Sequence, residues 1–259
     1  MTDARFDVPI YTLAEGARAL DVPQATFQTW ARGYVRRPAG KSTVKGRPII
    51  TDVGAAPGSP TIPFIGLAEG LVLAAIRKQG VPLQRIRPAI DVLQRELGIE
   101  HRLASRRLYT DGAEVLFDYA THTGDESVRE LVVVRHGQRV FSEIVDSYLR
   151  RVTFADDGFA QRLRLPQYAH AQVIADPRFS FGQPTFVHGR ARVSNALGRF
   201  QSGDSIETVA LEFGVPEAEL ETRCALHSDG LPDLFRDRSL GRPGAGTAAR
   251  LGTPACHPR

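Results

Sequence analysis

Side chains that could read DNA bases are grouped in one short stretch, residues 24–32. Phe27 and Trp30 are three residues apart, so a helix over this stretch would turn both inward and its polar side chains outward. The candidate base-contacting residues are Gln24, Gln28, Thr29 and Arg32. Amide, hydroxyl and guanidinium groups are those that pair with base edges in the major groove. The pattern therefore predicts a DNA recognition helix.

The residues that follow carry positive charge and no negative charge. Between Ala31 and Ile50 there are six Lys and Arg residues and no Asp or Glu, although the net charge of the chain is only +4. The candidate phosphate-contacting residues are Arg36, Arg37, Lys41, Lys45 and Arg47. Phosphate contacts supply affinity, whereas base contacts supply sequence preference. A helical core or a solvated loop explains either feature alone, but together they favour binding to double-stranded DNA.

A helix, a tight turn and a second helix must position these side chains. Thr12 and Glu15 have the spacing of a capping box, which predicts that the first helix begins after Thr12. The apolar stripe of this helix consists of Leu13, Ala17 and Leu20. Asp21 suits the turn, and Pro23 suits the first turn of the second helix.

Two short strands and two more helices are expected next. Val44–Ile50 and Thr61–Ile65 flank a Gly/Pro-rich loop, which is typical of the wing of a winged helix. Apolar residues at helical spacing then predict helices over Leu67–Lys78 and Pro82–Leu97. Residues 1–104 are therefore interpreted as a DNA-binding domain.

Residues 105–170 are expected to form a small antiparallel β-rich connector. Turn residues occur at Asp111-Gly112, at 136–138 and at Asp157-Gly158, between apolar runs. Residues 143–150 are expected to form a short helix. The His and Asp residues of this segment are interpreted as turn and surface residues rather than catalytic ones.

Residues 171–235 are expected to form a helical domain preceded by an extended β arm. The pattern predicts helices over Ser194–Gln201, from Ser205 onward, and over Glu217–His227. Six acidic residues and one Arg lie between Asp204 and His227, so phosphate would repel this second helix-turn-helix pair. We expect it to bind a protein, or only to hold a dimer together. The candidate partner-binding residues are Glu212, Glu217 and Glu221.

Composition restricts the remaining function classes. Hydrophobic residues make up 42% and charged residues 24% of the 259-residue chain, as in ordinary globular proteins. Cys224 and Cys256 form no metal-ligand pattern with the histidines, and the chain has no phosphate loop or hydrolase motif. We therefore expect no enzyme, metal or cofactor. Without an apolar span or leader, a cytoplasmic location is expected.

The expected fold class is mainly α with small β elements, that is, α+β. It combines an N-terminal winged helix-turn-helix, a β-rich connector and a C-terminal three-helix unit with its β arm. Residues 236–259 are rich in Gly, Pro, Ala and Arg without periodicity, and a disordered tail is expected there.

The N-terminal segment YTLAEGARALDVPQATFQTWARG resembles the MerR-type winged helix over roughly residues 11–98. The long antiparallel dimerisation helix of MerR regulators is missing, and so are the effector-binding cysteines at its ends. The resemblance implies DNA binding but does not extend to a metal or drug sensor.

The C-terminal segment resembles the domain of unknown function 433 family. The resemblance is carried by Asp176-Pro177-Arg178, Gly182-Gln183-Pro184, Gly189, Arg192-Val193, 203–207 and Phe213-Gly214-Val215. Ser194 stands where that family usually has Pro. With both segments, the chain resembles VapB-type antitoxins. The resemblances imply repression of the protein's own operon and neutralisation of a PIN-like ribonuclease toxin. A homodimer is also expected. The alternative is a stand-alone MerR-like transcriptional regulator whose C-terminal domain only dimerises.

The segment LPDLFRDRSLG, residues 231–241, resembles the opening strand of a PIN-like toxin, in which an early Asp binds metal. Asp237 would match that ligand, but the other carboxylates that a nuclease needs are missing. Read-through of an overlapping toxin gene and an ordinary tail are the two interpretations.

Overall fold

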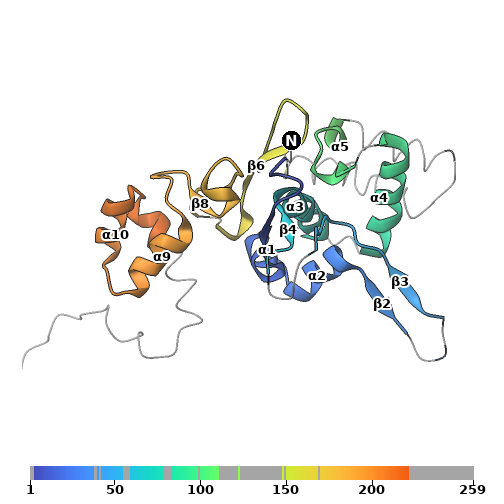
Figure 1. Ribbon diagram of the computed structural model, residues 1–259, viewed down its shortest axis with the longest axis horizontal. Helices are drawn as coiled ribbons and strands as arrows, with labels where there is room; N and C mark the ends of the chain where they lie inside the picture. Colours follow the sequence, from blue (N-terminus) through green and yellow to red (C-terminus); the bar gives the residue numbers. More distant parts are fainter. Residues whose placement is uncertain are drawn as a thin grey trace, which may run out of the picture.

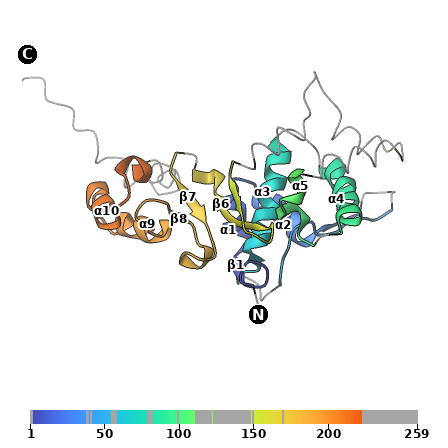
Figure 2. The ribbon, with the colours of Figure 1, turned by 90° about the horizontal axis from the view of Figure 1, so that it is seen from above.

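The computed structural model describes residues 3–37, 40, 42–54, 59–78, 83–98, 100–110, 122, 148, 150–168 and 170–221. Helices and small antiparallel sheets alternate along the chain, which confirms the expected α+β class. Figures 1 and 2 show three groups in a row: the N-terminal helices, a sheet in the middle, and the C-terminal helices at the far side. The β2–β3 hairpin projects from the N-terminal group (Figure 1).

The N-terminal group contains short strands and helices in mixed order. Its elements are β1 (Pro9–Tyr11), α1 (Leu13–Ala19), α2 (Gln24–Arg32), β2 (Tyr34–Arg36), β3 (Val44–Gly46), β4 (Ile62–Pro63), α3 (Phe64–Lys78), α4 (Leu83–Leu97), the 3-10 turn η1 (Arg102–Ala104) and α5 (Arg107–Thr110). The helix-turn-helix is α1 and α2.

The first turn of α1 is closed by the capping box that the sequence predicts. The Thr12 hydroxyl accepts a hydrogen bond from the Glu15 amide at 3.2 Å, and the Glu15 carboxylate accepts one from the Thr12 amide at 2.8 Å. Helix α1 ends at a turn in which Asp21 has a φ of 56°. In α2, Phe27 and Trp30 are buried and meet edge to face at 6.2 Å, so the inward face was predicted correctly.

Helix α3 is the centre of the N-terminal core. All of its residues from Phe64 to Ala74 are buried, because β1, α2, β4 and η1 pack around it. It begins at Phe64, earlier than the predicted Leu67, and follows Pro63 directly. Helix α4 agrees with the predicted Pro82–Leu97 to within one residue, and it buries Ile90 and Leu93.

The predicted pairing of the wing strands was wrong. β3 pairs with β2, which directly follows α2, in the register Tyr34↔Gly46, Val35↔Lys45 and Arg36↔Val44. β4 pairs instead with β1. Gly33 has a φ of 73°, so α2 ends there and the chain turns straight into β2. Pro48, which has no amide hydrogen for a ladder, follows shortly after the end of β3. The β2–β3 hairpin, residues 34–46, is called the wing below.

A four-stranded antiparallel meander forms the middle of the molecule. It runs in the order β5 (Val152–Phe154), β6 (Ala160–Arg164), β7 (Val173–Ala175) and β8 (Thr185–Phe186). The predicted turn at Asp157-Gly158 joins β5 to β6, and Gly158 has a φ of 83°. The sheet crosses residue 170, which was the predicted end of the connector, because β6 on one side of it pairs with β7 on the other. The hairpins predicted around 111–112 and 136–138, and most of the helix predicted for 143–150, lie outside the described residues.

The C-terminal unit contains α9 (Val193–Gln201), α10 (Ile206–Phe213) and the helical residues 217–221. The Ser205 hydroxyl caps α10 by accepting from the Thr208 amide at 3.2 Å. Gly214, with a φ of 63°, ends α10 in the left-handed conformation that favours glycine. Two 3-10 turns, η2 (Pro166–Tyr168) and η3 (Ser180–Gly182), connect the strands. Both cysteines, Asp237 and the predicted tail lie outside the described residues.

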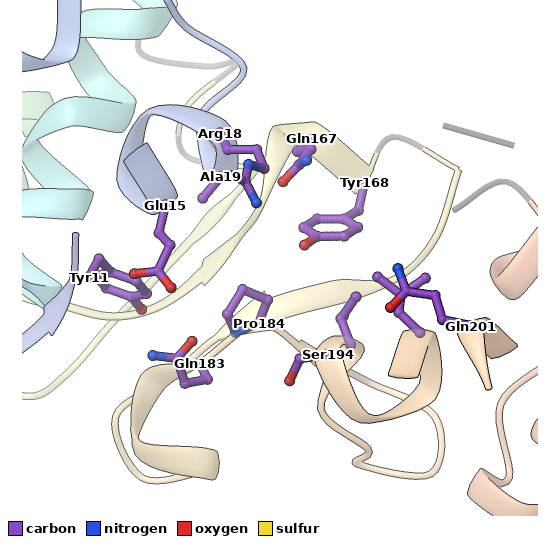
Figure 3. A pocket seen from close by; sticks show the side chains of 12 residues that line it. Tyr11, Glu15, Arg18, Ala19, Gln167, Tyr168, Gln183, Pro184, Ser194 and Gln201 are labelled. Atoms are coloured by element: carbon purple, nitrogen blue, oxygen red, sulfur yellow. The ribbon is translucent and has the colours of Figure 1, made fainter. Parts of the chain in front are cut away.

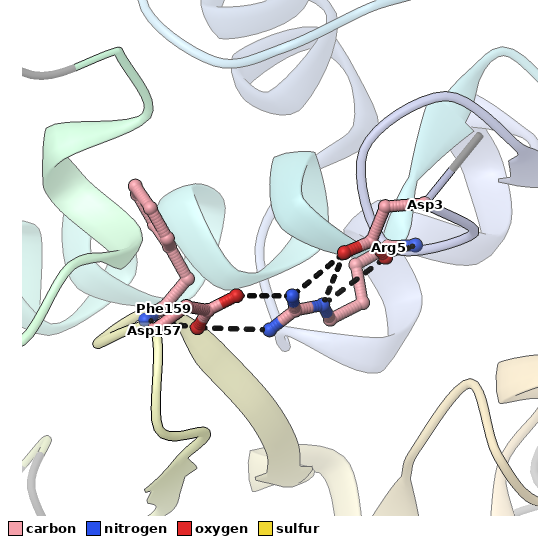
Figure 4. Close-up of polar contacts among 4 residues, drawn as sticks. All are labelled: Asp3, Arg5, Asp157 and Phe159. Carbon is pink, nitrogen blue, oxygen red and sulfur yellow. Dashed lines mark hydrogen bonds and ion pairs between the residues drawn. The ribbon is translucent and has the colours of Figure 1, made fainter. Parts of the chain in front are cut away.

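Arg5 links the start of the chain to the middle sheet. Its guanidinium pairs with Asp3 at 2.7 Å and also with Asp157 in the β5–β6 turn (Figure 4). Hydrogen bonds from Arg5 hold the pKa of Asp3 and of Asp157 below the ordinary value. These contacts join the N-terminal group to the sheet.

Strand β1 also contacts the loop before β8. The Tyr11 hydroxyl donates a hydrogen bond to the carbonyl of Gly182. The side-chain amide of Gln183 donates one to the carbonyl of Ile10 at 3.2 Å. A cavity lies beside these contacts, between α1 and α9, with Glu15 and Arg18 on one side and Ser194 on the other (Figure 3).

Candidate nucleic-acid interface

The outward face of α2 presents the predicted polar side chains unequally. Gln24 and Gln28 are exposed, whereas Phe27, Trp30 and Ala31 face the core. Gln24 lies at the start of α2, and residues near the start of a recognition helix are those that reach base edges. Both amides are therefore open to solvent, and Gln24 also lies at the start of the helix.

Thr29 and Arg32 already have partners within the chain. The Thr29 hydroxyl donates to the carbonyl of Ala25 at 2.8 Å. The Arg32 guanidinium lies 3.5 Å from the carboxylate of Asp52, and its side chain remains about half exposed. Thr29 thus keeps only acceptor capacity for DNA, and Arg32 would contact DNA while it is held by Asp52.

The wing carries the predicted positive charges away from the core. Arg36, Arg37 and Lys45 are exposed, as is Arg47 directly after the wing, and Lys41 lies outside the described residues. In the antiparallel register, Arg36 and Lys45 are not opposite each other, so successive side chains place charge on both faces of the hairpin. Val35 and Val44 are exposed on the same hairpin, at 60% and 47%. A projecting, basic two-stranded ribbon next to a recognition helix suits contact with the DNA backbone.

The base of the wing is held by Arg87 of α4, a residue that the sequence did not single out. The guanidinium carbons of Arg87 and Arg36 each lie 5.3 Å from the centre of the Tyr34 ring. Arg87 also donates a hydrogen bond to the carbonyl of Arg47. A Cβ at Gly46 would lie 2.3 Å from the same ring, so only glycine lets Tyr34 cover the strand. These contacts fix the direction of the wing relative to α4.

The C-terminal acidic residues do not form one continuous patch. Arg199 of α9 pairs with Asp204 at 2.8 Å and with Glu212 at 3.1 Å. Glu219 is buried, and accepts hydrogen bonds from the Gln172 amide at 3.1 Å and from His188 at 2.9 Å. Glu217 and Glu221 are exposed. Counting charge only from residue 204 onward missed Arg199, which neutralises part of the acidic surface.

Comparison with known proteins agrees with the helix-turn-helix geometry. Residues 9–90 match a family described as "Putative DNA-binding HTH domain". A Mycobacterium tuberculosis protein named "Putative antitoxin VapB45" is 50% identical over 224 residues, which cover 84% of this chain and 93% of that protein. The chain belongs to the VapB-type antitoxin family.

A solved structure and an uncharacterized protein, both from the same organism, also match the antitoxin. The crystal structure of Rv2018 from Mycobacterium tuberculosis has a TM-score of 0.69 and 46% sequence identity, and covers 84% of this chain and 97% of that chain. The uncharacterized protein Rv2308 is 25% identical over 229 residues, which are 83% of this chain and 88% of that protein. The likeness to these relatives therefore extends well beyond the helix-turn-helix.

The described part of the antitoxin also bears on metal binding and on membrane insertion. Among these residues, no group of three or more His, Cys, Asp and Glu is placed to hold a metal ion. No helix among them is long and apolar enough to span a membrane. The DNA-binding helix-turn-helix is the functional element that the comparisons support.

Proposed function

We propose that this antitoxin represses its own operon through the helix-turn-helix and wing, and neutralises a PIN-like ribonuclease toxin through its C-terminal unit. The observation that carries the proposal is family membership over most of the chain, combined with the exposed amides of α2 and the basic wing.

The DNA-binding part of the proposal assigns two kinds of contact. Gln24 and Gln28 read base edges in the major groove, with Thr29 and Arg32 beside them on α2. The side chains assigned to the phosphate backbone are Arg36, Arg37, Lys41, Lys45 and Arg47. We also propose that the protein acts as a homodimer, because helix-turn-helix dimers bind the two half-sites of a pseudo-symmetric operator.

The toxin-binding part assigns the C-terminal unit, residues 171–235, to the protein partner. Glu217 and Glu221 are exposed, and Glu212 lies beside them in sequence with part of its charge taken by Arg199. Leu211 on α10 is 87% exposed. An exposed apolar side chain in the same unit as exposed carboxylates suits a partner surface that combines positive charge with an apolar centre.

Two assays test the two parts separately. A reporter driven by the operon's own promoter should be repressed by the full chain, and repression should be lost with Arg36→Glu and Arg47→Glu together. Co-expression with the toxin should restore growth for the wild type and for that variant alike. Repression without growth rescue would leave the stand-alone regulator as the function, and rescue without repression would remove the operon-repression claim.

A further inference from the structure

The loop between β7 and β8 has an unusual backbone. Ser180, Phe181 and Gly182 have φ values of 49°, 54° and 79°, so three consecutive residues are left-handed and two of them are not glycine. Non-glycine residues in this conformation are strained, and they persist where surrounding contacts hold them. Here Gly182 is held by the Tyr11 hydroxyl, and Gln183 by the carbonyl of Ile10.

This strained backbone displays one aromatic ring to solvent. Phe181 is 80% exposed. The other large apolar side chains that are exposed among the described residues are valines and a leucine. Core packing does not account for a phenyl ring at this position, because the ring faces water. A bare ring on a fixed loop pays little ordering cost on binding and can fill a recess in a partner.

One arginine lies beside the Phe181 ring, and two more lie beside the neighbouring ring of Phe179. The Arg192 guanidinium carbon lies 5.9 Å from the Phe181 ring, while those of Arg190 and Arg178 lie 5.1 Å and 5.8 Å from the ring of Phe179. Arg190 is itself left-handed, with a φ of 52°. The loop therefore combines positive charge with an apolar tip.

A buried carboxylate holds the base of this loop. Asp176, whose side chain is fully buried, accepts from the Arg178 Nη2 at 2.8 Å, from the Arg178 amide at 3.0 Å and from Arg162 at 3.2 Å. The charge of Arg178 is thus paired with Asp176 within the chain, whereas those of Arg190 and Arg192 remain available to a partner.

We propose that Phe181, with Arg190 and Arg192, forms an anchor that docks on an acidic protein surface containing an apolar recess. The inference rests on the proposed function, since it assigns this acidic surface to the toxin, as a patch separate from the positive one that Glu217 and Glu221 would face. A nucleic acid is disfavoured, because Phe179 is half-buried beneath its arginines and leaves a single free ring, whereas stacking platforms use successive rings. The exposed carboxylates Glu217 and Glu221 of the same unit would also repel phosphate.

The test measures binding of the full chain to the purified toxin. Phe181→Ala should weaken binding by about tenfold or more, as truncated aromatic anchors do. Because the ring is exposed, the melting temperature of the variant should stay at the wild-type value. Val53→Ala, at a 40% exposed position in the N-terminal group, is the matched control and should bind as the wild type does.

Charge is tested by Arg190→Gln combined with Arg192→Gln. This variant should bind the toxin more slowly and lose part of the salt dependence of binding. Arg164→Gln, an exposed arginine of β6, is the control and should change neither. Ser180→Gly relieves strain but keeps the ring, so affinity should be retained while the melting temperature rises.

The outcomes separate this inference from the proposed function. If the wild-type chain does not bind the toxin, both are overturned. If the wild type binds and Phe181→Ala binds equally well, only the anchor is overturned. If Phe181→Ala instead weakens binding to a single-stranded oligonucleotide and leaves toxin binding intact, the occupant is a nucleic acid and the inference is wrong.

Discussion

Two helix pairs in this molecule use the same backbone devices but present opposite surfaces. In α1–α2 a Thr12 cap starts the first helix and a left-handed Asp21 makes the turn. In α10 and the helical residues after it, a Ser205 cap and a left-handed Gly214 do the same. The first pair leads into a basic wing, whereas the second exposes Glu217 and Glu221. The local motif thus fixes the shape of each pair, and the side chains outside the motif decide what it can bind.

The largest expected effect concerns the core of the DNA-binding pair. Trp30→Ala should destabilise the N-terminal group by roughly 3–5 kcal/mol, because Trp30 is 1% exposed and packs against Phe27. Thermal denaturation followed by circular dichroism measures this. Arg47→Ala is the control and should melt like the wild type. A stable Trp30→Ala protein that no longer binds DNA would place the tryptophan on the DNA side instead.

The second prediction separates base contacts from phosphate contacts. Gln28→Ala should relax sequence preference by about 1–3 kcal/mol at one base pair. Arg36→Ala should weaken binding to all sequences alike and reduce the salt slope by about one unit. Titrations of specific and unrelated duplexes at several salt concentrations distinguish the two. Identical behaviour of both variants would contradict the assignment of α2 to the groove.

The third prediction concerns the brace at the base of the wing. Arg87→Met removes the contact with Tyr34 and the hydrogen bond to the Arg47 carbonyl, and such cation–π contacts contribute about 0.5–2 kcal/mol. DNA affinity should fall several-fold, while the salt slope should stay close to that of the wild type, because Arg87 is assigned no phosphate. Arg95→Met, on the exposed part of α4, is the control. A loss of one full unit of salt slope would make Arg87 a phosphate contact instead.

The smallest effect is a pH dependence at the junction. Hydrogen bonds from Arg5 lower the pKa of Asp157 in the folded protein, so its contribution to stability is complete above the unfolded pKa, near about 3.9. The contribution is lost as pH falls through the lower folded value. The melting temperature of Asp157→Asn should therefore depend less on pH below about pH 4 than that of the wild type. Asp156→Asn, at an exposed neighbour, should leave the profile unchanged.

Local features of the fold could be predicted from the sequence, whereas contacts between distant segments could not. The capping box of Thr12 and Glu15, and the inward face with Phe27 and Trp30, follow from spacing within one helix. The prediction of the wing pairing was wrong because β2 contains an exposed Val and an exposed Arg, and lacks the alternation that marks a strand.

The site was predictable to a similar extent. Gln24, Gln28, Arg36, Arg37 and Lys45 are exposed as expected, since they lie on locally defined faces. Arg87 was missed because its contacts with Tyr34 and Arg47 join segments far apart in sequence. The left-handed Phe181 was missed for another reason: the conformation favours glycine, and tertiary contacts impose it here.

The division of labour between the two helix pairs is the central claim, and binding by charge-reversed full-length chains tests it most directly. One variant carries Arg36→Glu and Arg47→Glu, and the other carries Glu217→Lys and Glu221→Lys. Affinity for operator DNA and for the toxin is measured for both proteins. The account predicts that the first variant loses at least about tenfold in DNA affinity and keeps toxin binding, while the second weakens toxin binding and keeps DNA affinity. Loss of toxin binding in the first variant, or of DNA binding in the second, would contradict it.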